Sequence, residues 1–324
     1  MTAHALLDIH LTGADADAAL RADVRAGLTA VPKKLPPKWF YDARGSALFE
    51  QITQLPEYYP TRTERVLLES SVDEIAALAG ADTLVELGSG SSTKTRLLLD
   101  AFLRAGTLRR YIPQDVSEPA LRLAMDALAA DYPGLALHGV VGDFTAHLHM
   151  LPRGGHRMVA FLGGTIGNLL PVERAEFLDE LRAVLREGEH FLLGTGLVID
   201  EEPLVRAYDD AAGVTAEFNR NVLRVLNREV GADFDVDAFA HVALWDKANE
   251  WIEMRLRARR AMTVHVADLG MTVEFAQGEE MQTEISAKFR PEGVRAMLEE
   301  AGFEPVRAWT DPAARFSLTL ARAA

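Results

Sequence analysis

The stretch "TLVELGSGSSTKT", residues 83–95, decides the fold class. An apolar run ends near Glu86, and two glycines, Gly88 and Gly90, follow before a series of small polar residues. This pattern predicts a strand that runs into a glycine-rich turn and then a helix, as at the ligand-binding turn of open α/β sheets. Thr93 occupies the position that a dinucleotide fingerprint reserves for a third glycine, which weakens the case for a bound pyrophosphate.

The composition is that of a globular enzyme acting on a small molecule. The chain has 324 residues, a net charge of −14 and no cysteine, which excludes disulfides and thiolate chemistry. The negative charge argues against nucleic-acid and membrane partners, and no apolar run is long enough to predict a membrane span. The N-terminus lacks the pattern of a secretory signal. We therefore expect a cytoplasmic monomer. His147 and His149 have the spacing of some metal pairs, but no matching cluster is visible and no metal is expected.

Strand and helix patterns alternate from residue 63 onward, which predicts a parallel sheet with right-handed crossovers. The expected strands are residues 83–88, 109–117, 135–144, 156–168 and 190–199, and the expected helices are residues 63–79, 93–106, 118–133 and 171–185. A helix over 291–302 and a hairpin over 303–322 complete this part of the chain.

The rest of the chain follows a different pattern. Residues 12–31 predict a polar helix, and the segment that follows is broken by prolines yet rich in aromatic residues, so we expect it to be folded rather than a linker. Residues 200–262 predict helices, and residues 249–287 predict antiparallel strands. We expect a cofactor-binding domain of residues 63–198 plus 288–324 and an α+β substrate-binding domain of residues 11–62 plus 199–287.

Carboxylates at the ends of two further strands indicate the cofactor. Asp115 ends the strand after the glycine turn, where a carboxylate can accept both hydroxyls of a ribose, and Asp143 ends the next strand beside Phe144. With Glu86 and the terminal hairpin, these features are typical of class I S-adenosylmethionine-dependent methyltransferases. The turn is then expected to hold the amino-acid portion of S-adenosylmethionine. Spacing alone makes Lys94 an exposed helix lysine, and a nicotinamide oxidoreductase remains a weaker alternative.

Several longer segments resemble one enzyme family. They are "PPKWFYDARGSALFEQITQLPEYYPTRTE" (36–64), "VELGSGSSTKTRLLLDA" (85–101), "FLGGTIGNL" (161–169), "FNRNVLRVLNRE" (218–229) and "EMQTEISAKF" (280–289). Over essentially its whole length the chain resembles the histidine-specific N-α-methyltransferases of ergothioneine biosynthesis. The resemblance implies trimethylation of the α-amino group of L-histidine to hercynine with three molecules of S-adenosyl-L-methionine and no metal.

The resemblance also implies site residues. The cofactor contacts would be Tyr41, Gly88, Lys94, Asp115, Asp143 and Phe144, and the histidine contacts would be Tyr58, Gly163, Asn168, Tyr208, Met254, Glu284 and Ser286. Tyr41, Tyr58 and Gly163 are expected nearest the chemistry, because a glycine lets the amine lie close to the backbone. Together with Phe49, the tyrosine faces can attract the quaternary ammonium product.

Purely structural alternatives exist for most of these residues. Asn168 could be a helix N-cap. Tyr208 and Met254 could be core residues. Glu284 and Ser286 share one side of a predicted strand, which could be an exposed edge face. The functional alternatives are a related methyltransferase that acts on another amino acid and a catalytically silent S-adenosylmethionine-binding module.

Overall fold

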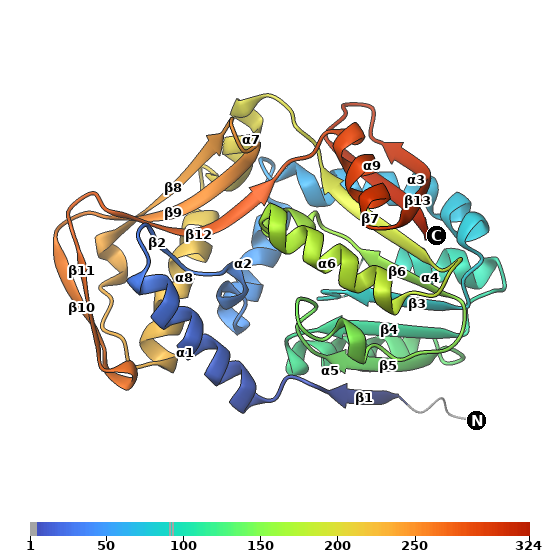
Figure 1. The fold of residues 1–324 in the computed structure, drawn as a ribbon, viewed down its shortest axis with the longest axis horizontal. Helices are drawn as coiled ribbons and strands as arrows, with labels where there is room; N and C mark the ends of the chain where they lie inside the picture. The colour runs from blue at the N-terminus through green and yellow to red at the C-terminus, as the bar shows by residue number, and fades with distance from the viewer. Residues whose placement is uncertain (1–4, 91, 93) are drawn as a thin grey trace. The chain divides into compact units, whose positions relative to one another are not determined.

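The chain forms two compact units in a computed structural model that describes residues 5–90, 92 and 94–324 (Figure 1). Thr93 of the glycine turn lies outside the described residues. Unit 1 comprises Met1–Thr12, Thr63–Leu197 and Phe289–Ala324, and unit 2 comprises Gly13–Arg62 and Val198–Lys288.

Unit 1 is built on an eight-stranded sheet with the order β1-β5-β4-β3-β6-β7-β14-β13. The strands are β1 (Leu6–Ile9), β3 (Thr83–Leu87), β4 (Arg110–Asp115), β5 (Ala136–Val141), β6 (Arg157–Phe161), β7 (His190–Gly196), β13 (Phe303–Thr310) and β14 (Phe316–Ala323). Neighbouring strands pair in parallel along the part of this order that reads β1-β5-β4-β3-β6-β7. Strand β14 pairs antiparallel with both β7 and β13. The predicted α/β class with a terminal hairpin is confirmed. Strand β1 was not predicted, because its four residues depend on pairing with β5.

Helices cover both faces of this sheet. Helices α3 (Tyr59–Ala79), α4 (Thr95–Arg104) and α5 (Glu118–Asp131) lie on the far face in Figure 1, and α6 (Pro171–Val184) and α9 (Pro291–Glu300) lie on the near face. Ile75, Phe102 and Leu121 of the far helices share one hydrophobic core with the strands. No helix of the described residues has the length and apolar character that crossing a bilayer requires.

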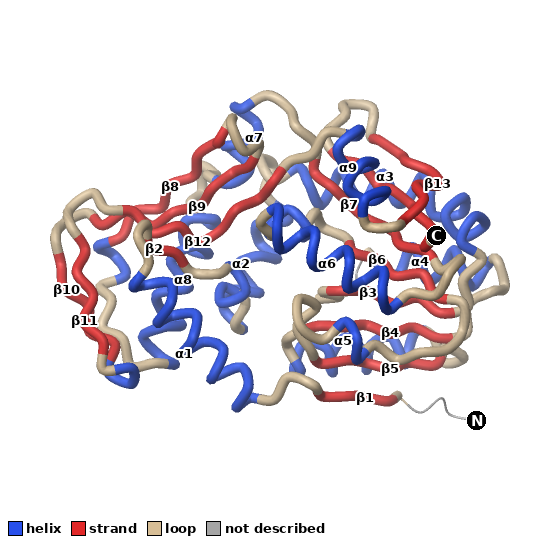
Figure 2. Tube along the Cα trace, viewed as in Figure 1, coloured by secondary structure: helices blue, strands red, loops and turns tan. Residues whose placement is uncertain are grey.

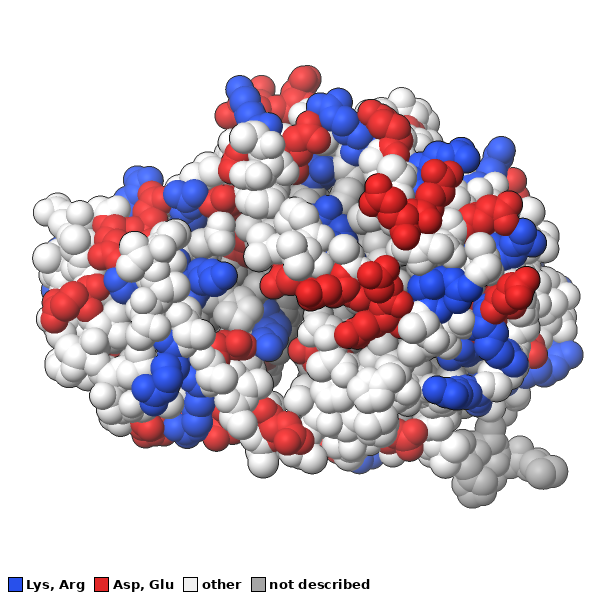
Figure 3. Space-filling model, in the orientation of Figure 1, with Lys and Arg blue, Asp and Glu red and all other residues white. Residues whose placement is uncertain are grey.

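Helix α6 shows how the sequence separates core from solvent. It buries Phe177, Leu178 and Leu181, which recur at helical spacing. Its solvent-facing side carries Glu173, Glu176, Asp179 and Glu180, all exposed. Acidic side chains gather along this helix on the surface drawn in Figure 3. This face accounts for part of the chain's negative charge.

The strand order reverses between β3 and β6. From β3 the chain proceeds outward through β4 and β5, and it then returns to place β6 on the other side of β3. In open α/β sheets, ligands bind at the carboxyl ends of the strands beside such a reversal. The glycine turn, Asp115 and Asp143 all lie at these carboxyl ends, each directly at or after the end of its strand.

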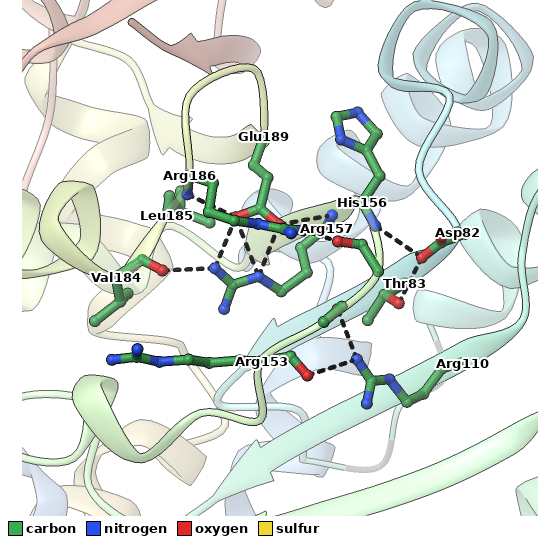
Figure 4. Close-up of polar contacts among 12 residues, drawn as sticks. Asp82, Thr83, Arg110, Arg153, His156, Arg157, Val184, Leu185, Arg186 and Glu189 are labelled. Atoms are coloured by element: carbon green, nitrogen blue, oxygen red, sulfur yellow. Dashed lines mark hydrogen bonds and ion pairs between the residues drawn. The ribbon is translucent and has the colours of Figure 1, made fainter.

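The opposite end of the strands carries a buried ion pair (Figure 4). Arg157, at the start of β6, is 2% exposed and donates to both carboxylate oxygens of Glu189 at 2.6–3.1 Å. The backbone N–H of Arg186 donates to the same carboxylate at 2.8 Å. Burial acts to raise the pKa of Glu189, but the bonds from Arg157 and Arg186 hold it at about 2. These groups satisfy one another at the end of the sheet away from the glycine turn.

Unit 2 combines helices with a small sheet of the order β2-β12-β9-β8 and a separate hairpin (Figure 2). The strands are β2 (Lys33–Lys34), β8 (Phe239–Asp246), β9 (Trp251–Ala258), β10 (Met262–Val266), β11 (Met271–Phe275) and β12 (Glu280–Ala287). The helices are α1 (Gly13–Thr29), α2 (Ala43–Gln54), α7 (Glu201–Tyr208) and α8 (Val214–Glu229). The antiparallel strands expected over 249–287 are confirmed. The prediction of helices throughout 200–262 is wrong at β8, where pairing with β9 overrides the helical propensity of alanine and leucine.

Helix α8 holds the aromatic N-terminal segment and the sheet in one frame. The Asn221 amide donates to the carbonyl of Phe40 at 3.1 Å. Two residues earlier, the Asn219 amide donates to the carbonyl of Arg255 at 3.1 Å and its oxygen accepts the Thr283 hydroxyl at 2.7 Å. Both asparagines are fully buried, so each unmade bond would leave a polar group without water. The motif at 218–229 therefore has a structural purpose within unit 2.

Candidate active site

The glycine turn after β3 is held by a buried glutamine. Gly88 and Gly90 have φ of +65° and +49°, values that favour glycine. The N–H of Gly88 donates to the side-chain oxygen of Gln114 at 3.3 Å, and the Gln114 amide donates to the carbonyl of Gly142. Gln114 therefore ties the turn after β3 to the turn after β5. Our sequence reasoning did not identify it, although a glutamine inside an apolar strand is a signal.

Asp115 lies at the carboxyl end of β4 with both oxygens directed to backbone donors. One oxygen accepts the N–H of Gly90 at 2.9 Å and the other accepts the N–H of Ser117 at 2.9 Å. Burial raises the pKa of Asp115, and these backbone bonds act in the opposite direction. Ser117, whose side chain accepts the N–H of Ala120, is the N-cap of α5, so Asp115 is not there as a helix cap. Each oxygen keeps acceptor capacity for a further donor.

Asp143 and Phe144 follow β5 as expected. Asp143 accepts the N–H and the hydroxyl of Thr145 at 2.8 and 2.7 Å. The ring of Phe144 packs edge-on against Phe161 and Phe177 at 5.0 and 5.9 Å between centroids. The carboxylate of Asp143 thus directly precedes, in sequence, a residue of an aromatic cluster. A carboxylate suits the polar edge of an adenine, and an aromatic ring suits its flat face.

Lys94 is engaged with a buried acid. It forms an ion pair with Glu64, and its side chain is only 25% exposed, so its interpretation as an exposed helix lysine is wrong. The other oxygen of Glu64 accepts the N–H of Gly163 at 2.7 Å. Glu64 was not identified from the sequence. Its signal was the helical period, since Glu64 lies on the same side of its helix as the buried Leu67 and Leu68.

The segment after β6 contains the next two expected residues. Gly163 follows β6, and Asn168 ends the short 3₁₀ helix η3 (Thr165–Asn168). The N-cap of α6 is Leu170, whose N–H donates to Glu173 at 2.8 Å. The interpretation of Asn168 as the cap of this helix is therefore wrong. Asn168 is half-buried near the carboxyl end of β6.

In unit 2, the predicted aromatic residues form a continuous row. Ring centroids are separated by 5.6 Å between Tyr41 and Phe49, 6.2 Å between Phe49 and Tyr58, and 6.1 Å between Tyr58 and Tyr208. All three contacts are edge-to-face. Phe218 of α8, which we had not identified, lies 5.4 Å from Tyr41 and 5.9 Å from Phe49. The proline-broken segment is thus an ordered aromatic surface.

The two tyrosines at the end of this row keep their protons at neutral pH. Burial raises the pKa of Tyr58, and the nearby tyrosines and Glu284 add to the effect. Burial likewise raises the pKa of Tyr208, followed by the charge of Glu284. Both hydroxyls are therefore hydrogen-bond donors at neutral pH rather than phenolate bases.

Strand β12 presents Glu284 and Ser286 in a buried setting. Glu284 is 9% exposed and Ser286 is 5% exposed, so the interpretation of an exposed edge face is wrong. An irregularity between Gln282 and Glu284 shifts the register of β12 against β9, and Glu284 then lies opposite Met254. Met254 belongs to the hydrophobic core of unit 2, so its interpretation as a core residue is confirmed. It also lies opposite Glu284 on the neighbouring strand.

Lys288 directly follows the end of β12 and completes a buried triangle with Tyr208 and Ser286. Its ammonium donates to the Tyr208 oxygen at 2.9 Å and to the Ser286 oxygen at 2.7 Å, and the two hydroxyls are 2.7 Å apart. Burial lowers the pKa of Lys288, while Tyr59 and Glu284 act in the opposite direction. We did not identify Lys288 from sequence, although its alternation with Glu284 and Ser286 was visible.

The residues of unit 1 fit S-adenosylmethionine. Asp115 has acceptor capacity for ribose hydroxyls, and Phe144 supplies an apolar face beside Asp143. The hydroxyl of Ser89, within the glycine turn, is buried and has no hydrogen-bond partner among the described residues. A buried polar atom without a partner is costly, so a polar ligand at this turn would remove that cost.

Comparison with known proteins identifies the family. Residues 20–323 match the family described as histidine-specific methyltransferase, SAM-dependent. The chain is 62% identical over 312 residues to Histidine N-alpha-methyltransferase of Mycolicibacterium smegmatis, covering 96% of this chain and 97% of that protein. It is 57% identical to the protein of the same name from Mycobacterium tuberculosis, covering 94% of each. It is 29% identical to Ergothioneine biosynthesis protein 1 of Neurospora crassa, covering 86% of this chain and 32% of that protein.

The resemblance stated from the sequence motifs and the prediction of S-adenosylmethionine as cofactor are both confirmed by these matches. The roles of individual site residues stay predictions. The chain belongs to the family of histidine-specific, S-adenosylmethionine-dependent methyltransferases.

Proposed function

We propose that this chain methylates the α-amino nitrogen of L-histidine three times to give hercynine, a step of ergothioneine biosynthesis. Family membership and the names of the two mycobacterial relatives support the substrate and the position of transfer. The observation that carries the proposal is the buried pair of Glu284 and Ser286 on β12. A carboxylate and a hydroxyl on one side of a strand suit the two nitrogens of an imidazole ring.

The residues of unit 1 are proposed to hold the cofactor. When bound, S-adenosylmethionine supplies an electrophilic methyl group on a positively charged sulfur. Asp115 would accept the ribose hydroxyls, Asp143 and Phe144 would bind the adenine, and the turn at Gly88 would approach the amino-acid portion. Lys94, with its buried partner Glu64, would set the position of this region against the loop after β6.

The residues of unit 2 are proposed to hold the amino acid. Glu284 would accept a ring N–H and Ser286 would bond the other ring nitrogen, beside Met254. Asn168 is proposed to bind the carboxylate, and Tyr208 is proposed to act on the ring through its hydrogen bond to Ser286. Held in this way by its ring and carboxylate, histidine would offer only its α-nitrogen to the methyl donor.

The aromatic row is proposed to stabilise the product. Each methyl transfer requires the amine to have lost a proton, and the third transfer leaves a permanent cation. Aromatic faces attract such cations by about 0.5–2 kcal/mol. Tyr41, Phe49 and Tyr58 supply adjacent faces within one ordered surface. Tyr41 is proposed to contact the cofactor as well, and Gly163 the amine.

We further propose that the chain works as a cytoplasmic monomer with neither nucleic acid nor membrane as a partner. The net charge of −14 supports the absence of anionic partners.

A substrate panel tests the proposal. The purified chain is incubated with S-adenosylmethionine and, separately, with histidine, tryptophan, phenylalanine and arginine, and release of S-adenosylhomocysteine is measured. We expect turnover with histidine to exceed turnover with each other amino acid by at least a factor of about ten. Equal turnover of tryptophan would indicate the related methyltransferase, and no turnover with calorimetrically detectable cofactor binding would indicate the silent binding module.

A further inference from the structure

The buried triangle of Lys288, Tyr208 and Ser286 has a fixed number of hydrogens. A lysine ammonium has only donors, so the two hydroxyl oxygens accept from Lys288 at 2.9 and 2.7 Å. The hydroxyls are also bonded to each other at 2.7 Å, which uses the hydrogen of one of them. One hydroxyl hydrogen is therefore left over. Because all three side chains are at most 8% exposed, water does not compete freely for that hydrogen.

We propose that Lys288 is a positioning residue that sets the direction of this leftover hydrogen, so that the site selects a neutral imidazole ring. This inference rests on the proposed function, in which Glu284 and Ser286 bind the two ring nitrogens. Glu284 as a carboxylate can only accept, so it takes the ring N–H. The hydrogen left on the hydroxyl pair then meets the other nitrogen, which must carry a lone pair.

The same arrangement rejects other rings. A phenyl ring and an indole ring offer no in-plane lone pair, so the leftover hydrogen would be buried without an acceptor. A protonated imidazolium offers two N–H groups and would also place its charge near the ammonium of Lys288. Tyr59 and Glu284 are the titratable groups whose ionised forms would favour that ammonium, and Tyr208 contacts it directly. Lys288 would therefore favour a ring with one N–H and one bare nitrogen.

The bound ring can be observed directly in the wild-type protein. Ring-¹⁵N-labelled histidine is added with S-adenosylhomocysteine, which has no methyl group to transfer, and ¹⁵N shifts are recorded from pH 5 to pH 8. Free imidazole titrates near pH 6.5. We expect the bound ring to keep one protonated and one bare nitrogen well below that pH. A bound imidazolium at pH 5.5 would overturn the inference, whereas no histidine binding would instead remove the proposed function.

Variants of Lys288 give a second test. We expect Lys288→Met to raise KM for histidine about 10- to 100-fold, to leave the affinity for S-adenosylmethionine within about twofold, and to flatten the rise of KM below pH 6.5. The ratio of kcat/KM for phenylalanine to that for histidine should rise. Lys288→Arg retains the charge and the donors and should recover part of the loss. Lys247→Met is the matched control, because Lys247 is 75% exposed and its ion pair is with the surface residue Glu201.

Two outcomes of the variant test would overturn the inference. One is an unchanged KM with an unchanged pH profile in Lys288→Met. The other is an equal loss of cofactor and histidine binding, which would mean that Lys288 only supports the fold. If Lys288→Met does not fold, the ¹⁵N measurement on the wild-type protein decides between the two interpretations.

Discussion

Replacing Asp115 tests the proposed ribose site. The carboxylate already accepts backbone N–H groups from Gly90 and Ser117 at 2.9 Å each, one on each oxygen. Each oxygen has capacity left for one ribose hydroxyl. Asp115→Ala removes both acceptors, and Asp115→Asn removes the charge while it keeps the size of the side chain.

The expected magnitude follows from these contacts. A hydrogen bond to a charged group contributes about 1.5–3 kcal/mol, so Asp115→Ala should weaken S-adenosylmethionine binding roughly 10- to 150-fold. Asp115→Asn should lose less, because one amide oxygen still accepts. The Ala variant also leaves the N–H groups of Gly90 and Ser117 without their partner, so some loss of thermal stability is expected as well.

Calorimetric titration with S-adenosylhomocysteine measures the effect, and thermal unfolding is recorded for each variant. Asp126→Asn is the control, because Asp126 is an exposed residue of α5 away from the carboxyl end of the sheet. An Asp115→Ala protein that folds and binds the ligand with wild-type affinity would refute the placement of the ribose.

Glu64→Gln should lower the free energy of unfolding in urea by about 1–3 kcal/mol, because Lys94 loses its charged, buried partner. It should also reduce histidine turnover, because the carboxylate that accepts the N–H of Gly163 is replaced. Wild-type values for both quantities would show that this contact has no importance. Glu284→Leu should lower kcat/KM for histidine at least about tenfold and make tryptophan a relatively better substrate, and an undiminished preference for histidine would contradict the ring assignment. Burial raises the pKa of Glu86 from 4.5 to about 7. The folded state then binds the extra proton, so stability should fall, by up to about 3 kcal/mol, as pH rises from about 4.5 to about 7. Glu86→Gln should remove this fall, as urea unfolding at pH 5 and pH 8 would show; an identical fall in the variant would assign it to other groups.

The core of unit 1 could be predicted because its signals are local. Each strand is a short apolar run, each helix has a period of 3.6, and the glycine turn and the aspartates stand at the strand ends. The edge strand β1 and the strand β8 could not be predicted in the same way. Their sequences are short or carry alanine and leucine, and pairing with β5 and β9 decides their conformation.

The candidate site divides similarly. Residues whose chemistry is visible in a motif, such as Asp115 and Glu284, were expected, and their surroundings were not. Glu64 and Lys288 act through partners 99 and 80 residues away in the chain, Gly163 and Tyr208 respectively. Glu64 shares the side of its helix with Leu67 and Leu68, and Lys288 shares the strand side of Glu284 and Ser286, but neither residue was predicted to be buried. No local pattern gives the partner that makes burial of a charge acceptable. The register shift before Glu284 likewise arises from pairing with β9 rather than from the strand's own residues.

Fragmentation mass spectrometry of the reaction product tests the central claim most directly. Histidine is incubated with the purified wild-type chain and S-adenosylmethionine carrying a ¹³C-labelled methyl group, and products are sampled from the first turnover to completion. The account predicts mono- and dimethyl intermediates followed by a trimethyl product, with all labelled methyl groups on the α-nitrogen. Labelled methyl groups on the imidazole ring, or a reaction that ends at one methyl group, would contradict it.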